Sequence, residues 1–407
     1  VSQMLVVWDK KMFKNKNILI VVSGSVAAYK SATLVRLLIK MGANVRVSMT
    51  HAAQEFIPSK TMAILSGHDV LTDLFAGQGA DVVHIAWAKW AEVIFVVPAT
   101  ANIIGKLANG IADDAPTATV MASAAEKIVI PAMNDVMYNN PAVQRNIEHL
   151  SSDGWLLIEP SIGFLAEGYE AKGRLPEPDM ILSEAAIRLQ AKNGLLHGKK
   201  VIITAGSTRE ALDPVRYITN RSSGKMGFAL AQAAAEQGAH VTLITTVTKP
   251  AIYGVNQILV SSTQEMFDAA IAAFETADIF IGAAAVSDFK PEKTDHHKIK
   301  KTGDSGLTIK LVQNPDILKT IGQHKTHSQI VVGFAAETQN VEAYGADKLV
   351  TKNADMLIAN DVSRSDIGFS SDDNSVTILT RDKQPEFLDR APKITIARHI
   401  ISRIVTL

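Results

Sequence analysis

The chain has no cysteine among its 407 residues. Disulfides, thiolate-bound metals and any mechanism that needs a protein thiol are therefore excluded. The chain also has no excess of either charge, since 41 Lys and Arg residues balance 41 Asp and Glu residues. No field of one sign is available to attract nucleic acid or an anionic membrane, so an anionic ligand must be bound by local groups. We expect neither a nucleic acid nor a membrane as a partner.

Long apolar runs are absent as well. No stretch approaches 18 consecutive apolar residues, and the run Met4–Trp8 near the N-terminus is too short for a signal peptide. Hydrophobic residues make up 47% of the chain and charged residues 20%, which is an ordinary globular balance. Because 407 residues exceed what one core usually organises, the sequence predicts a cytoplasmic protein with two domains.

One local pattern occurs twice. An apolar run, a Gly-Ser pair and a helical segment follow one another at Ile18–Ser25 and again at Val201–Ser207. In each copy the run is typical of a buried strand, and Gly24 or Gly206 allows a tight backbone turn. Amide groups left free at the start of the following helix can bind an anion. The repetition predicts two nucleotide-like sites, one in each domain.

Both halves alternate between strand-like and helix-like segments, which predicts two doubly wound, mostly parallel, Rossmann-like α/β sheets. We place the boundary near Asn193, giving domains 1–193 and 194–407. Ser161–Pro178 and Asp288–Lys310 interrupt the rhythm, and we expect a mobile flap and a second exposed loop. The expected strands are Ile18–Val22, Val45–Met49, Val93–Val97, Ile128–Ile130, Trp155–Ile158, Val201–Ala205, Val241–Thr245, Ile279–Gly282, Ile330–Phe334 and Met356–Ala359. The expected helices are Val26–Met41, Ala101–Ala108, Asp179–Ala191, Lys225–Gln237, Gln264–Ala277 and Tyr344–Lys352.

The first half carries three motifs at the expected strand ends but no dinucleotide fingerprint, because Gly24 lacks partner glycines at the required spacing. The motifs are Gly24-Ser-Val-Ala-Ala-Tyr-Lys30, Pro98-Ala-Thr-Ala-Asn102 and Pro131-Ala-Met-Asn134. Thr100 and Asn102 follow a strand, at the edge where open α/β sheets bind ligands. The alternative for Thr100 is that it only caps a helix.

Together these motifs resemble the flavin-dependent cysteine decarboxylases, over about residues 17–189. The resemblance implies a flavodoxin-like flavoprotein fold with FMN as cofactor. It also implies that His84 assists proton removal and that Asn134 orients the substrate carboxylate. In this family the flavin oxidises the thiol to a thioaldehyde, so that CO₂ leaves and an enethiolate is then reduced and protonated. The implied FMN contacts are Gly24, Ser25, Thr50, Thr100 and Asn102.

The flap departs from this family at one position. Many relatives carry an Ala-Cys-Gly there, whose thiol supplies the final proton, whereas this chain has Leu165-Ala-Glu167-Gly. A carboxyl group with a pKa near 4.3 is a poor proton source at neutral pH. Closure of the flap over an apolar site would raise that pKa. We therefore take Glu167 as the acid, with a solvated loop charge as the alternative.

The second half contains Gly224-Lys225, but a P-loop is excluded because Thr219 and Met226 occupy positions that require glycine and Ser or Thr. A helix start near Gly224 still suits an anion, with a merely capped helix as the alternative. Lys348 and Lys352 are four residues apart on an expected helix, so their ammonium groups share a face. Such a pair suits neutralisation of a triphosphate.

From about Gly198 to Val405 the chain resembles the CTP-using phosphopantothenate–cysteine ligases of bacteria, most continuously at Thr208–Gly227. The resemblance implies that 4′-phosphopantothenate attacks CTP and that cysteine then displaces CMP from an acyl-cytidylate, with Mg²⁺ on the phosphates. It implies that Lys298 acts in the first step, that Asn220 holds the intermediate and that Arg216 faces a neighbouring subunit. Asp288 reads the cytosine or holds the metal. The implied CTP contacts are Gly282, Ala283, Ala284, Asp288, Lys298, Pro315, Asp316, Ile317, Leu318, Phe334, Lys348 and Lys352.

The order of the two halves is that of the bacterial bifunctional coenzyme A biosynthesis family. This resemblance implies that the ligase product is the substrate of the decarboxylase. It also implies a homo-oligomer, with ligase dimers and decarboxylase trimers that would combine into a dodecamer. The alternatives are an active ligase joined to a regulatory or binding-only flavoprotein domain, and a generic nicotinamide dehydrogenase, which would be colourless rather than yellow.

Overall fold

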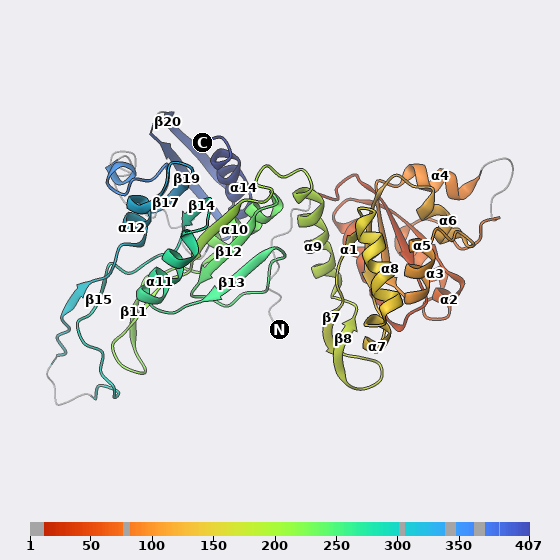
Figure 1. Cartoon of the computed structure of the whole chain (residues 1–407), viewed down its shortest axis with the longest axis horizontal. Helices are drawn as coiled ribbons and strands as arrows, with labels where there is room; N and C mark the ends of the chain where they lie inside the picture. Colours follow the sequence, from red (N-terminus) through yellow and green to blue (C-terminus); the bar gives the residue numbers. More distant parts are fainter. Residues whose placement is uncertain (1–11, 76–81, 301–305, 338–346, 362–370, 382) are drawn as a thin grey trace. The chain divides into compact units, whose positions relative to one another are not determined.

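The computed structural model describes residues 12–75, 82–300, 306–337, 347–361, 371–381 and 383–407. The chain divides into two compact units, Val1–Ala186 and Ile187–Leu407, each of which is an α/β structure (Figure 1). The division falls within helix α9 (Pro178–Ala191). The boundary that we expect near Asn193 lies just after this helix.

The first unit is built on a six-stranded sheet whose paired strands are all parallel, in the order β3-β2-β1-β4-β5-β6. This confirms the predicted doubly wound sheet. Without the two-residue edge strand β3, the order is that of flavodoxin-like proteins. The strands are β1 (Asn17–Val22), β2 (Asn44–Met49), β3 (Val70–Leu71), β4 (Val93–Ala99), β5 (Glu126–Pro131) and β6 (Leu156–Leu157).

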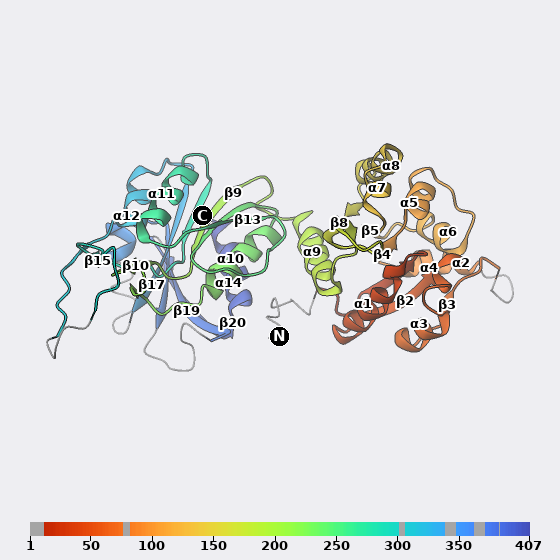
Figure 2. The same cartoon turned by 90° about the horizontal axis from the view of Figure 1, so that it is seen from below.

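Helices cover both faces of this sheet because the side chains of its central strands are buried on both sides (Figure 2). Leu19 and Val21 of β1 pack in one cluster with Ile103 and Leu107 of α5. The helices are η1 (Val26–Ala28), α1 (Tyr29–Lys40), α2 (His51–Gln54), α3 (Ser59–Ser66), α4 (Val83–Trp90), α5 (Ala101–Ala108), α6 (Ala115–Met121), α7 (Asp135–Tyr138) and α8 (Pro141–Ser152).

The expected irregular flap is a regular β-hairpin, which corrects the sequence prediction. Strands β7 (Ser161–Phe164) and β8 (Glu170–Arg174) pair antiparallel, with a register shift after Ser161. The strands escape detection because they are short and their pattern of exposed and buried residues is irregular. The Leu165 amide donates to the Tyr169 carbonyl at 2.8 Å and closes the turn that carries Glu167.

The second unit contains an eight-stranded sheet in the order β13-β12-β9-β14-β17-β18-β19-β20, in which the last two strands run antiparallel to their neighbours. This confirms the predicted mostly parallel sheet and adds a hairpin that the sequence did not indicate. The strands are β9 (Lys200–Ala205), β12 (His240–Thr245), β13 (Val255–Leu259), β14 (Ile279–Gly282), β17 (Ile330–Glu337), β18 (Met356–Asp361), β19 (Asp373–Thr380) and β20 (Lys383–Pro392).

Alternate residues of β9 divide this core between two faces. Val201 and Ile203 pack in the cluster that includes α10 and α14, whereas Ile202 packs with α11 and α12. Two short antiparallel pairs extend from the main sheet, β10 (Arg209–Ala211) with β11 (Tyr217–Thr219) and β15 (Phe289–Pro291) with β16 (Leu311–Gln313). The helices are α10 (Lys225–Glu236), α11 (Thr263–Phe274), α12 (Ile317–His324) and α14 (Lys393–Ile404).

Candidate active sites

The first candidate site lies where the loops after β1, β2 and β4 meet at the carboxyl edge of the sheet. Strands β1 and β4 are neighbours in the sheet, but the strand that follows β1 lies on one side of this pair and the strand that follows β4 lies on the other. The carboxyl ends of β1 and β4 are therefore the switch point at which such folds bind ligands. Gly24 and Ser25 follow β1, Thr50 follows β2, and Thr100 follows β4. Tertiary structure therefore gathers four of the predicted FMN contacts from three separate loops.

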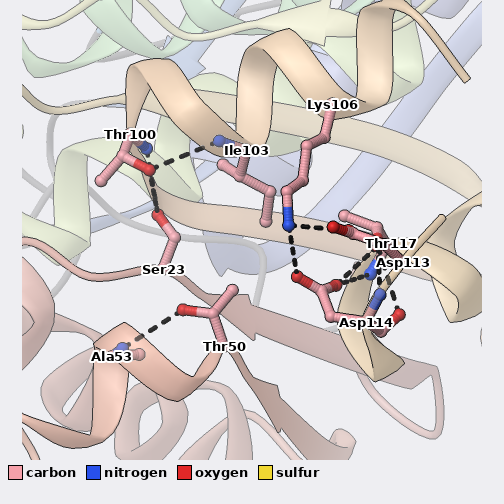
Figure 3. Close-up of polar contacts among 9 residues, drawn as sticks. All are labelled: Ser23, Thr50, Ala53, Thr100, Ile103, Lys106, Asp113, Asp114 and Thr117. Carbon is pink, nitrogen blue, oxygen red and sulfur yellow. Dashed lines mark hydrogen bonds and ion pairs between the residues drawn. The ribbon is translucent and has the colours of Figure 1, made fainter. Parts of the chain in front are cut away.

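A buried hydroxyl group joins two of these loops. Ser23 Oγ donates to the Pro98 carbonyl oxygen at 2.7 Å and lies 3.2 Å from Thr100 Oγ1. It also accepts a hydrogen bond from the Thr100 amide at 3.0 Å (Figure 3). Because Ser23 is only 1% exposed, these bonds form away from competing water. Ser23 thus fixes Thr100 relative to the loop after β1, a role that we had not assigned to it.

The threonines of this site cap helices. Thr50 Oγ1 accepts from the Ala53 amide at 3.2 Å, and Thr100 Oγ1 accepts from the Ile103 amide at 3.5 Å (Figure 3). The capping interpretation of Thr100 is therefore confirmed. Capping also turns the first amides of α5 toward the sheet edge, and Asn102 lies exposed in that first turn. Contact with FMN stays a prediction for these residues.

Gly24 lies where the loop after β1 approaches the loop after β2. A Cβ atom at Gly24 would lie 2.6 Å from Ala52 Cβ and 3.0 Å from the Ala52 carbonyl carbon. Any side chain would therefore push the two loops apart. The tight packing of these two loops therefore requires glycine at position 24.

His84 is the second residue of α4 and is partly buried. Its Nδ1 atom is buried and has no hydrogen-bond partner among the residues that the structure describes. Buried polar atoms without a partner are rare and call for an explanation such as a missing ligand. The orphaned nitrogen fits the predicted role of His84 in proton transfer, which stays a prediction.

The flap hairpin brings Glu167 to Asn134. The Asn134 side-chain amide donates to Glu167 Oε1 at 3.1 Å and to the Tyr169 hydroxyl oxygen at 2.9 Å. Asn134 Oδ1 accepts from the Val136 amide at 2.9 Å and so caps α7. The Tyr169 hydroxyl in turn donates to Asp135, and this bond raises the pKa of the phenol.

Tyr169 and Asp135 are thus members of this site that sequence reasoning missed. Asp135 directly follows the Pro131–Asn134 motif and could have been found there. Tyr169 gave no signal, because only the folded hairpin brings it to α7.

A neighbouring charged cluster is structural. Lys106 of α5 bonds to Asp113 at 2.7 Å and to Asp114 at 3.1 Å (Figure 3). The bond to Asp113 is the largest influence on Lys106 and raises its pKa. Asp114 also forms a capping box with Thr117 at the start of α6. These bonds hold the α5–α6 connection beside the first site.

The second candidate site is a pocket of about 980 Å³ at the carboxyl ends of β9, β14 and β17. Its volume suits a nucleotide-sized ligand. Its lining combines the end of β14, the start of α12, the start of α10 and residues near the end of β17. The predicted residues that line it are Asn220, Gly282, Ala283, Ala284, Asp288, Pro315, Asp316, Ile317, Leu318, Phe334, Lys348 and Lys352.

Two asparagines shape the floor of this pocket. The Asn220 side-chain amide donates to the Val286 carbonyl oxygen at 3.0 Å. The Asn314 side-chain amide donates to the Ser287 carbonyl oxygen at 2.9 Å, and the Asn314 backbone amide donates to the Asp288 carbonyl oxygen at 2.9 Å. These bonds fix the segment after β14 against the segment that starts α12.

Lys352 contacts the start of α12, and Lys348 lines the pocket. Residues 347–351 are helical, and the Lys352 amide donates to the Lys348 carbonyl oxygen at 3.0 Å. Positions 344–346 of the expected helix lie outside the described residues. The Lys352 ammonium pairs with Asp316, which also caps α12. Two predicted CTP contacts from distant segments therefore touch each other.

Lys298 is not among the described residues that line the pocket. It is exposed, and its neighbour Ile299 is held by the β10–β11 connection. The Ile299 amide donates to Asp213 Oδ2 at 3.1 Å, and Arg216 donates to the Ile299 carbonyl oxygen at 2.7 Å. Arg216 also binds Asp213, which holds the pKa of this carboxyl well below its usual range. Arg216 therefore anchors the Lys298 segment within its own chain, and its contact with a neighbouring subunit stays a prediction.

No group of three or more His, Asp or Glu side chains suited to a metal ion occurs in the described part of the chain. Asp288 is exposed at the pocket, and its binding of Mg²⁺ stays a prediction. None of the helices in the described ranges is both long and apolar enough to cross a membrane.

Comparison with known proteins finds relatives for both halves. Residues 8–190 match the family described as Flavoprotein, and residues 196–407 match the DNA/pantothenate metabolism flavoprotein C-terminal domain. Over 400 residues the chain is 46% identical to the coenzyme A biosynthesis bifunctional protein CoaBC of Bacillus subtilis strain 168, covering 97% of this chain and 98% of that protein.

Two solved structures cover one half each. The crystal structure of the C-terminal domain of a CoaBC protein is 39% identical, with a TM-score of 0.44, over 52% of this chain and 97% of that one. A PPC decarboxylase mutant complexed with pantothenoylaminoethenethiol is 31% identical, with a TM-score of 0.40, over 43% of this chain and 98% of that one.

Proposed function

Because the chain belongs to the family of coenzyme A biosynthesis bifunctional proteins, we propose that it makes 4′-phosphopantetheine in two steps. Residues 194–407 ligate 4′-phosphopantothenate to cysteine at the expense of CTP, and residues 1–193 decarboxylate the product. The observation that carries the proposal is the 980 Å³ pocket, which gathers twelve predicted ligase residues from segments far apart in the sequence.

In the ligase half, the pocket holds CTP and the acid substrate side by side. Lys348 and Lys352 neutralise the triphosphate. Asp288 would hold Mg²⁺, which would supply further positive charge to the phosphates. Asn220, whose amide already lies along the segment after β14, holds the acyl-cytidylate for attack by the amine of cysteine. On the family resemblance we assign Lys298 to the charge that develops in the first step, although it does not line the pocket in this structure.

In the decarboxylase half, the carboxyl edge of the first sheet holds FMN. The turn without a side chain at Gly24, the start of α5 at the sheet edge and the orphaned His84 nitrogen all fit such a ligand. When bound, the flavin supplies the redox chemistry that makes loss of CO₂ possible. His84 takes up a proton from the substrate, Asn134 orients the carboxylate, and Glu167 returns a proton.

The test is a reaction with purified full-length protein, Mg-CTP, cysteine and 4′-phosphopantothenate, with CMP and CO₂ followed separately. We expect a yellow protein that releases both products. Lys298→Gln should stop release of CMP but leave decarboxylation of added 4′-phosphopantothenoylcysteine intact. CMP release without CO₂ would instead support the alternative of a flavoprotein domain that only binds or regulates. A colourless protein that releases neither product would contradict the proposal.

We also propose that the protein is a homo-oligomer in which ligase units pair and decarboxylase units form trimers, giving a dodecamer. Sedimentation of the full-length protein measures this directly. A monomer at micromolar concentration would contradict the proposal.

A further inference from the structure

Three lysines converge at the start of α10, next to the pocket of the second unit. Lys225 is the first residue of α10, and Lys393 is the first residue of α14. Lys249 follows β12, and its Nζ atom lies 4.8 Å from the centre of the Phe228 ring in the first turns of α10. We call Lys225, Lys249 and Lys393 the lysine cluster. Lys225 and Lys393 line the pocket itself.

The segment 371–373 ties two members of the lysine cluster together. Lys225 pairs with Asp372 Oδ1 at 2.6 Å. The Lys393 backbone amide donates to the Asp372 carbonyl oxygen at 2.9 Å, and its ammonium donates to the carbonyl oxygens of Ser371 and Asp373. The two ammonium groups are therefore held around one short stretch of backbone.

In the described part of the chain, the lysine cluster has more ammonium groups than carboxylates that pair with them. Asp372 is the carboxylate bound to Lys225, and its side chain is 76% exposed. Asp373 pairs with Arg390 at 3.0 Å, and Lys249 forms no ion pair with any described residue. Lys393 is only 8% exposed, so its charge is largely removed from water. Gathering partly buried like charges is unfavourable unless an anion completes the site.

The electrostatics of the individual lysines agree with this geometry. Burial is the largest influence on Lys249, followed by the charges of Lys225 and Lys393, and together they lower its pKa to about 8 despite the opposing charge of Asp372. Burial and the charge of Lys225 also lower the pKa of Lys393. Burial and the neighbouring ammonium charges thus both disfavour the charged forms of Lys249 and Lys393.

The backbone around the lysine cluster is also shaped for an oxyanion. Gly224 caps α10 in the left-handed conformation, with φ of 69°, and leaves the first amides of this twelve-residue helix without a side-chain cap. Beside it, the buried hydroxyl groups of Ser207 and Thr246 have no hydrogen-bond partner among the described residues. A Cβ atom at Gly206 would lie 2.2 Å from Thr246 Oγ1, so this hydroxyl group lies directly against the turn.

We propose that Lys249 and Lys393, together with Lys225, bind a phosphate group of a ligase substrate at the start of α10, and that Asp372 takes the place of that phosphate when no substrate is bound. The inference rests on the proposed ligase function. Neither Lys249 nor Lys393 carried any signal in the sequence. The phosphate belongs either to the triphosphate of CTP or to 4′-phosphopantothenate, which present the same chemistry to ammonium groups.

The test is isothermal titration calorimetry of full-length protein with Mg-CTP and, separately, with 4′-phosphopantothenate. Lys249→Met and Lys393→Met should each weaken binding of one of these ligands by about ten-fold, as expected for loss of a charge-assisted hydrogen bond. The ligand affected identifies the source of the phosphate. Lys383→Met removes an equal charge from the exposed strand β20 and should leave both affinities unchanged.

Asp372→Asn should change the ligand affinity in the opposite direction to the two lysine variants. A merely structural role of Asp372 would not strengthen binding. It removes the competing carboxylate from Lys225, so the affected ligand should bind several-fold more tightly. Lys249 donates no hydrogen bond to any described residue, so replacing it by Met removes no such bond from the folded protein. Wild-type affinity in both lysine variants, or weaker binding by Asp372→Asn, would overturn the inference. If the wild-type protein binds neither ligand, the proposed ligase function itself fails.

Discussion

Asn134 and Glu167 are hydrogen-bonded, with the asparagine amide 3.1 Å from the carboxylate oxygen, although 33 residues separate them in the chain. Sequence reasoning assigned them separate tasks, substrate orientation and proton return. The hairpin β7–β8 brings the two side chains that would perform them into contact. The side chain that would hold the leaving carboxylate thus already touches the group that would supply the final proton.

The first prediction concerns this pair. Glu167→Gln removes an acidic proton but keeps the hydrogen bond to Asn134, so decarboxylation should fall by about 100-fold or more, as for loss of a general acid. Flavin content should not change. Turnover is measured as CO₂ release from 4′-phosphopantothenoylcysteine.

Two further variants sharpen this test. Glu167→Cys should restore part of the activity, since a thiol can also return a proton. Glu170→Gln, on the same hairpin and equally exposed, should behave like the wild type. Near-normal turnover in Glu167→Gln would remove Glu167 from the mechanism.

The second prediction concerns Ser23, which joins the loops after β1 and β4. Ser23→Ala breaks the bonds to Pro98 and Thr100, so the start of α5 should lose its fixed position and the protein should retain FMN about ten-fold less tightly. Flavin release is followed by fluorescence during dialysis. Ser31→Ala is the matched control, because Ser31 is buried and bonds to the Val97 carbonyl oxygen at 2.8 Å but is not part of the ligand loops. Equal loss of FMN in both variants would contradict a specific role of Ser23.

The third prediction concerns pH and Lys249. The pKa of Lys249 is lowered to about 8 in the free protein, and a bound phosphate would raise it again. Binding should therefore take up a proton between about pH 8 and pH 10, and affinity should fall as pH rises through this window. At pH 8.5 the uptake is roughly three quarters of a proton.

Calorimetry in two buffers with different ionisation enthalpies measures this uptake. Lys249→Met should reduce this uptake, because the amine with the pKa of about 8 would be gone, and Lys393, whose pKa is also lowered, would account for the remainder. Uptake that persists undiminished in the variant would assign the proton to another group.

The fourth prediction concerns stability. Glu236 of α10 is buried and accepts hydrogen bonds from Arg398 of α14 at 2.6 and 2.7 Å. Glu236→Gln should cost about 3 kcal/mol of unfolding free energy, because it removes the buried carboxylate charge from the ion pair with Arg398. Glu386→Gln is the control, since Glu386 also binds α14, through Arg403, but is more exposed, and its loss should cost less than about 1 kcal/mol. Scanning calorimetry of the full chain gives both effects as shifts in Tm, and equal shifts would contradict the reasoning.

The sequence alone predicted the central strands well because their apolar runs are continuous. It predicted α5 with its exact bounds, since Thr100 caps it and Ile103, Ile104 and Leu107 supply one buried face. It did not indicate the antiparallel strands β19 and β20. Strand β20 is largely exposed and carries charged residues throughout, so it has no apolar pattern to detect.

At the two sites, some residues could likewise be predicted from the sequence and others could not. Motifs of consecutive residues, such as Pro131–Asn134 and Thr208–Gly227, indicate the chemistry of each site because the geometry of a loop depends mainly on its own residues. Tyr169, Lys249 and Lys393 enter the sites only through contacts between distant segments. The sequence by itself determined the fold class, the two-part organisation and the principal candidate residues. Only the tertiary structure decided which charges and hydroxyl groups lie beside them, because burial and proximity are properties of packing between segments that no single segment encodes.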